Sequence, residues 1–208
     1  RIYQYVLEDK KSGGDLYKHL HHSAKKRKKR YGSPDRRGQI KNKVSIEDRP
    51  KIVDEKKRIG DWEIDTVIGK NHKGALVTIV DRVSKFTVIA KVPTKHADVV
   101  TKATIKSLSL YAGVVHTITS DNGTEFSGHE EISKSLNAQI YFAHPYSSWE
   151  RGLNENTNGL IRQYVPKGSS FDNVTNHTAK KIMESLNNRP RKALNYMTPN
   201  EFLYELTG

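Results

Sequence analysis

The chain has 208 residues, of which 35% are hydrophobic, and it carries a formal net charge of +13. This length suits one domain with a sizeable core and appended segments, or two small domains. The absence of cysteine excludes a disulfide framework and a thiolate metal site. No apolar run approaches the roughly 20 residues that a membrane-spanning helix needs.

The positive charge is concentrated near the start of the chain. Residues 1–60 hold 19 Lys and Arg against 8 Asp and Glu, whereas residues 61–208 hold 17 against 15. A basic arm joined to a nearly neutral body indicates a polyanionic partner, most often nucleic acid. We predict that residues 1–58 form a DNA-binding arm or linker, with a solvated tail as the alternative. Its expected DNA contacts are Lys25, Lys26, Arg27, Lys28, Lys29, Arg30, Arg36 and Arg37.

Few regular elements are expected in the arm, and strands dominate the start of the body. After Gly13-Gly14, Asp15 can cap a short helix that runs to Leu20. Three segments rich in Val, Ile and Thr then follow with short connections, which predicts antiparallel neighbours. These segments span residues 61–69, 74–82 and 85–93.

Helices and strands alternate in the rest of the chain. We expect helices over 96–113, 125–136, 150–165 and 175–188, and strands over 114–120 and 138–143. Thr198, Pro199 and Glu201 form a capping box that begins a last helix. Three antiparallel strands followed by alternating helices and strands predict a mixed five-stranded sheet with helices on its faces.

Two acidic residues in this framework occupy unusual positions. Asp65 lies within the first strand, where Asp is uncommon, although an exposed edge position would also account for it. Glu63 shares the same face of the strand and is a competing candidate. Asp121 follows the strand over 114–120 and opens an Asp-Asn-Gly turn that leads towards a helix. Sites in open α/β sheets form at such strand ends, while a hairpin turn is the alternative.

A third acidic residue, Glu155, lies on the helix expected over 150–165. At about 100° per residue, one side of this helix collects apolar residues and the opposite side collects polar ones. The apolar side holds Leu153, Thr157, Leu160, Ile161 and Tyr164, and the polar side holds Arg151, Glu155, Asn158 and Arg162. The polar side suits a metal ligand among phosphate contacts, or an ordinary row of intrahelical ion pairs. Three carboxylates converging at one sheet edge favour Mg²⁺ or Mn²⁺ and phosphodiester chemistry.

Four stretches of the chain resemble the catalytic part of bacterial transposases of the insertion-sequence-thirty family. They read GDWEIDTVIGK, TSDNGTEF, HPYSSWERGLNENTNGLIRQYVPKG and NNRPRKALNYMTP, and they fall within residues 60–200. The resemblance implies a ribonuclease H-like fold over residues 59–208. It also implies a DDE triad at Asp65, Asp121 and Glu155, which favours Asp65 over Glu63. Family members carry an N-terminal helix-turn-helix region that is not recognisable in the first 60 residues, so we expect it upstream.

The resemblance further implies a reaction and its partners. A DDE transposase nicks the ends of its element and uses the freed 3′-hydroxyl to attack another phosphodiester, with Mg²⁺ as cofactor and Mn²⁺ as a substitute. Double-stranded DNA, comprising the terminal inverted repeats and the target, would be the substrate of a homodimer or larger assembly in the bacterial cytoplasm, at the nucleoid. Further DNA contacts are expected from Arg151, Asn158, Arg162 and Lys167.

Two other functions compete with this interpretation. A retroviral-type integrase or another ribonuclease H-like nuclease would share the triad but not the stretch ERGLNENTNGLIRQY. A non-catalytic nucleic-acid-binding module would explain the basic arm. It would not explain the carboxylates, because acidic groups on a DNA-facing surface weaken binding unless a metal neutralises them.

Overall fold

The computed structural model describes residues 2–19, 40–145 and 147–207, and it divides the chain into two compact units, residues 1–37 and 38–208. In the first unit, α1 (Ile2–Lys11) precedes a 3-10 turn, η1 (Leu16–His19). The turn starts after Asp15 as predicted, whereas α1 was not foreseen. The basic residues Lys25–Arg30, Arg36 and Arg37 lie outside the described residues.

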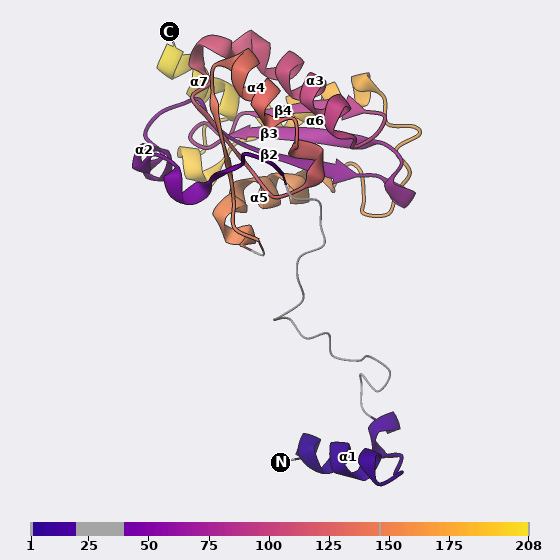
Figure 1. The fold of residues 1–208 in the computed structure, drawn as a ribbon. Helices are drawn as coiled ribbons and strands as arrows, with labels where there is room; N and C mark the ends of the chain where they lie inside the picture. The colour runs from indigo at the N-terminus through magenta and orange to yellow at the C-terminus, as the bar shows by residue number, and fades with distance from the viewer. Residues whose placement is uncertain (1, 20–39, 146, 208) are drawn as a thin grey trace. The chain divides into compact units, whose positions relative to one another are not determined.

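The second unit is built on a mixed sheet with the strand order β1-β6-β5-β2-β3-β4. Figure 1 shows β2, β3 and β4 side by side in this sheet. Its strands are β1 (Val44–Ser45), β2 (Asp61–Ile68), β3 (Ala75–Asp81), β4 (Thr87–Val92), β5 (Thr117–Ser120) and β6 (Gln139–Phe142). The strands β2, β3 and β4 pair antiparallel, and β2, β5, β6 and β1 pair parallel. The five predicted strands are present, and β1 adds a sixth.

Residues 40–58 pack with the body, although we had placed them in the arm. Val53 is fully buried, Ile40 is nearly so, and β1 pairs with β6. Arg49 is also buried, and its Nη1 donates to Thr119 Oγ1 on β5 at 2.8 Å. The compact unit therefore begins near residue 38 and not near 59. The sequence did not indicate this boundary, because residues 40–58 are highly charged and only a few apolar residues among them pack into the core.

Helices cover both faces of the sheet. The helices α3 (Ala97–Leu108) and α4 (His129–Leu136) contribute Val100, Leu108, Ile132 and Leu136 to a core with Ile64, Val77 and Ile79. The opposite face packs Val67 and Leu76 against α5 (Gly152–Ile161) and α6 (Asn176–Asn187). Because side chains alternate along a strand, Glu63 and Asp65 point with Val67 towards the α5 face.

The helix boundaries differ modestly from those expected. A 3-10 turn takes over at Ser109 after α3, and α4 starts four residues later than predicted, after the turn η5 (Thr124–Phe126). The capping box of α7 (Pro199–Thr207) is confirmed, since Glu201 N donates to Thr198 Oγ1 at 3.1 Å and Thr198 N to Glu201 Oε2 at 2.7 Å. In the described part of the chain, no helix is long and apolar enough to cross a membrane.

Candidate active site

The parallel pairing of β2 and β5 brings two of the predicted carboxylates to the same level. Glu63 is in register with Thr119, so Asp65 and Asp121 each lie two residues beyond a matched pair. Asp121 follows the last residue of β5, and its Oδ1 accepts a hydrogen bond from Gly123 N at 2.9 Å. The Asp-Asn-Gly sequence therefore forms a turn at the end of a strand and does not connect a hairpin.

Asp65 is held by donors from its own strand and from α5. Its Oδ1 accepts from Thr66 N at 2.7 Å, and its Oδ2 accepts from Asn158 Nδ2 at 3.1 Å. Burial raises the pKa of Asp65, the neighbouring Arg151 opposes that rise, and the charge of Asp121 adds to it. The charge of Asp121 thus lies close enough to disfavour ionisation of Asp65.

Arg151 lies between these two carboxylates. Its Nη1 is 3.4 Å from Asp65 Oδ2, and its Nη2 is 3.3 Å from Asp121 Oδ2. The same Nη1 donates to the carbonyl of Ile64 at 3.3 Å, and only 12% of the side chain is exposed. We expected Arg151 on a DNA-facing surface, whereas here its cation contacts both acids. Two carboxylate oxygens directed at one positive charge form a donor set that suits a hard divalent cation.

For Glu155, the third predicted ligand, the structure records no contact with Asp65, Asp121 or Arg151. Glu155 is exposed on α5. Among the residues that the structure describes, no group of three or more acidic or histidine side chains is placed to hold a metal ion. The buried side of α5 consists of Asn154, Thr157 and Ile161, so the helix is rotated relative to the expected apolar side. This rotation turns Asn158 towards Asp65. The structure therefore brings together Asp65 and Asp121, and places Glu155 on the adjoining helix.

Glu63, the competitor of Asp65, is engaged elsewhere. Its buried carboxylate accepts from Arg82 Nη1 at 2.8 Å and from Asn154 N at 3.0 Å. With both oxygens accepting hydrogen bonds, Glu63 links β2 to the residue that follows β3 and to the first turn of α5. This arrangement suits a structural role better than metal ligation.

A further carboxylate that was not singled out from the sequence, Glu125, adjoins the site. It is buried, and its Oε1 accepts from Thr66 Oγ1 at 3.1 Å. A Cβ added to Gly123 would lie 2.7 Å from the Glu125 carboxyl carbon and 2.9 Å from Asp121 Oδ1. A side chain at position 123 would therefore displace the carboxyl groups of Glu125 and Asp121. In the sequence, Glu125 could have been singled out because it precedes Phe126. Both residues are buried in the short turn Thr124–Phe126.

Comparisons with known proteins place this chain in a family. The integrase core domain family matches residues 55–148. The transposase for insertion sequence element IS4351 of Bacteroides fragilis is 52% identical over 200 residues, which cover 96% of this chain and 61% of the relative. Transposase InsI for IS30A of Escherichia coli strain K12 is 40% identical over 165 residues, or 79% of this chain and 43% of the relative. The chain belongs to the insertion-sequence-thirty family of transposases. It spans 61% of the length of the first of these curated relatives and 43% of the second.

Solved structures confirm the predicted fold class of this chain. The catalytic core domain of BIV integrase aligns with a TM-score of 0.53 and 22% identity, covering 71% of this chain and 95% of that domain. A chain of the simian T-cell lymphotropic virus intasome, in complex with a PP2A regulatory subunit, aligns with a TM-score of 0.57 and 19% identity over 69% of this chain and 54% of its own length. These integrase cores are ribonuclease H-like, as predicted here.

The other DNA contacts expected from the sequence, Asn158, Arg162 and Lys167, have different surroundings. Arg162 donates to the carbonyls of Ile68 at 2.9 Å, Val165 at 3.4 Å and Pro166 at 3.5 Å, so it fastens the end of α5 to β2. Asn158 faces Asp65, and Lys167 is exposed. A DNA contact by any of them stays a prediction.

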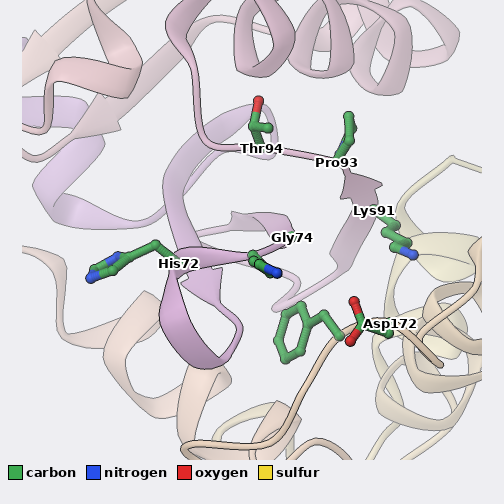
Figure 2. Close-up of a pocket in the computed structure, with 8 residues that line it drawn as sticks. His72, Gly74, Lys91, Pro93, Thr94 and Asp172 are labelled. Carbon is green, nitrogen blue, oxygen red and sulfur yellow. The ribbon is translucent and has the colours of Figure 1, made fainter.

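Figure 2 shows a hollow of about 460 Å³ in the second unit. It is lined by His72, Lys73, Gly74, Lys91, Pro93, Thr94, Phe171 and Asp172. In Figure 2, Asp172 lies on the same side of this hollow as Lys91. Neither Asp65 nor Asp121 contributes to its lining, so the hollow is not part of the candidate active site.

Proposed function

We propose that the chain is the catalytic part of a DNA transposase that cuts the ends of an insertion sequence and transfers the cut strands to new DNA. The observation that carries this proposal is the convergence of Asp65 and Asp121 on one cation, at neighbouring strand ends of an integrase-type core. The 52% identity to an insertion-sequence transposase supports the reaction class.

The acidic residues would hold a divalent cation, and integrase-type cores depend on such metals. We assign Mg²⁺ to Asp65, Asp121 and Glu155, with Mn²⁺ as a substitute, because all three offer hard oxygen ligands. A bound metal would activate the attacking oxygen and stabilise the leaving oxygen. Asn158, Thr66 N–H and Gly123 N–H fix the orientation of the two aspartates before the cation binds.

Two successive phosphoryl transfers would follow at this one site. In the first, the oxygen of water forms a bond to phosphorus while the bond to the 3′-oxygen breaks, which frees a 3′-hydroxyl. In the second, that hydroxyl forms a bond to a phosphorus of the target strand while one existing P–O bond breaks. The number of phosphodiester bonds is conserved in the second step, so joining needs no external energy source.

Charge supports double-stranded DNA as the substrate. The net charge of +13 would release counterions from the duplex on binding. We propose that the terminal inverted repeats and the target DNA are the two duplexes that the protein binds. We also propose that the DNA-bound state is a dimer or a larger assembly. The intasome match indicates a likeness of fold to a protein of such an assembly.

The experiment incubates the protein with Mg²⁺ and duplex DNA that carries candidate element ends, then maps nicked and joined strands. Nicks at the ends together with joined products are expected, and Asp65→Asn is the matched inactive control. Nicks without joined strands would indicate a nuclease. DNA binding without either product would indicate a non-catalytic module and overturn the proposal.

A further inference from the structure

We infer that Arg151 is the internal counter-ion of the Asp65–Asp121 pair, and that a divalent cation binds only when the Arg151 guanidinium leaves the two carboxylates. This inference rests on the proposed function, because it concerns the metal site assigned there. It changes the role expected for Arg151 from a standing phosphate contact to a competitor for the metal position.

The first step concerns which oxygens are available. Asp65 Oδ1 and Asp121 Oδ1 accept from backbone N–H groups of Thr66 and Gly123, at 2.7 and 2.9 Å. Both Oδ2 atoms face Arg151. The backbone donors hold the carboxylates in place whether or not Arg151 is present. Asp65 Oδ2 also accepts from Asn158 Nδ2 at 3.1 Å, so the amide and the guanidinium share this oxygen. A metal would use the same two Oδ2 atoms, and therefore the metal and the Arg151 guanidinium cannot bind there together.

The second step concerns how firmly Arg151 is held. Charge-assisted hydrogen bonds usually measure about 2.7–2.9 Å. Arg82 reaches Glu63 at 2.8 Å, and Arg58 reaches Asp61 at 2.8 and 2.9 Å, yet Arg151 stays 3.3 and 3.4 Å from its two acids. Its buried Nε has no hydrogen-bond partner among the described residues. The Arg151 guanidinium thus neutralises the two carboxylates without forming short hydrogen bonds to them. This weak contact suits a group that a metal ion must displace.

The third step concerns the room for departure. Arg151 is the last residue of the 3-10 turn η6 (Ser148–Arg151) and precedes α5. In the same turn, the Trp149 side chain is 75% exposed. At Gly152, a Cβ would meet nothing within 4 Å. Positions on both sides of Arg151 are therefore open to solvent, and we expect the guanidinium to withdraw in that direction.

The test measures Mn²⁺ binding by calorimetry, without DNA, for wild type, Arg151→Gln and Arg151→Lys. Removing the competing cation is expected to tighten Mn²⁺ binding about tenfold in Arg151→Gln, a typical coupling between two sites. Lysine keeps the charge but lacks the two-pronged fork, so its affinity should fall between the other two. Arg189→Gln removes the same charge from an exposed position and should bind Mn²⁺ like wild type.

Thermal unfolding provides an independent readout. Without metal, Arg151→Gln should unfold at a lower temperature than wild type, because two neighbouring carboxylates then repel each other. Mn²⁺ should raise its unfolding temperature more than that of wild type, since a ligand that binds more tightly stabilises more.

Equal or weaker Mn²⁺ binding by Arg151→Gln would overturn the inference and leave the proposed function intact. If the glutamine variant does not fold, unchanged affinity in Arg151→Lys overturns it instead. Absence of Mn²⁺ binding in every protein would overturn both the inference and the metal-dependent function.

Discussion

The side-chain amide of Asn158 donates to Asp65 Oδ2 at 3.1 Å across 93 positions of sequence. Its carbonyl oxygen accepts from the buried Thr78 Oγ1 at 3.0 Å. Asn158 therefore links α5 to β2 and β3 at the level of the acidic pair. An amide can make both bonds at once because it carries a donor and an acceptor.

Asn158→Ala should weaken both the fold and the reaction. Losing two partly buried hydrogen bonds is expected to lower the free energy of unfolding by roughly 1–2 kcal/mol. Strand-transfer rate should fall by about tenfold or more, since Asp65 loses an orienting donor. Denaturant unfolding and a strand-transfer assay measure the two effects. Asn156→Ala, at an exposed position of the same helix, is the control, and equal effects of both variants would contradict this role.

Substitutions in the proposed triad test DNA cleavage and stability separately. Asp65→Asn, Asp121→Asn and Glu155→Gln should each reduce DNA cleavage by at least about a hundredfold, because each removes a charged ligand but keeps the side-chain shape. Glu155 is exposed, so Glu155→Gln should leave the unfolding temperature unchanged. Cleavage rates and thermal unfolding of the purified variants provide the measurements.

The choice of control matters for this series. Glu63→Gln would disturb the 2.8 Å ion pair with buried Arg82, so it tests the fold as much as the chemistry. Exposed Glu131 on α4 is a better control, and Glu131→Gln should cleave like wild type. Wild-type cleavage by any one triad variant would remove that residue from the site.

The turn that carries Arg151 should respond to pH. His144 contacts Glu150 through Nδ1 at 2.8 Å and Glu47 through Nε2 at 3.2 Å, and these carboxylates raise its pKa above the ordinary 6.5, chiefly through the Glu150 hydrogen bond. Because the pKa is raised in the folded state, the stabilisation is fully present below about 6.5 and is lost as pH rises through the folded-state value.

NMR titration of the His144 ring measures this effect directly. The midpoint should lie above 6.5 in wild type and move down towards 6.5 in Glu150→Gln, which cannot offer a charged acceptor. Trp149 gives a second signal, since it is 75% exposed while Trp62 is 2% exposed. Its fluorescence should change over the same pH range. A wild-type midpoint at or below 6.5 would show that the carboxylates do not hold the ring.

Periodicity and turn residues predicted most of the sheet but not its edge. The strands over 61–93 were recognisable because Val, Ile and Thr repeat between short connections. The strand Val44–Ser45 has only two residues in a charged segment and forms through pairing with β6, which no local pattern reports.

The candidate site was predictable in part for a similar reason. Asp65 lies in β2 and Asp121 directly follows β5, so strand pairing fixes their relation. Arg151 and Asn158 depend on how α5 is rotated against the sheet. That rotation is set by the buried Asn154 and by its backbone bond to Glu63, and hydrophobic spacing does not encode either feature.

The basic arm should contribute DNA affinity without sequence preference. Lys25, Lys26, Arg27, Lys28, Lys29 and Arg30 are consecutive cations that repel each other in isolation. Against a duplex, each can displace condensed counterions, so neutralising about six phosphates should steepen the slope of log affinity against log salt by roughly five. Removal of residues 1–37 is the appropriate deletion, because residues 40–58 pack with the body.

Salt titrations of binding by fluorescence anisotropy, on end-containing and random DNA, measure this contribution. The shortened chain should lose affinity for both DNAs and show the shallower slope, while Mn²⁺ binding stays unchanged. Replacing the six cations by glutamine is the matched variant and should reproduce the deletion. Equal slopes for full and shortened chains would mean that the arm is a solvated tail. A loss confined to end-containing DNA would mean that it reads sequence, because phosphate contacts alone weaken uniformly across sequences.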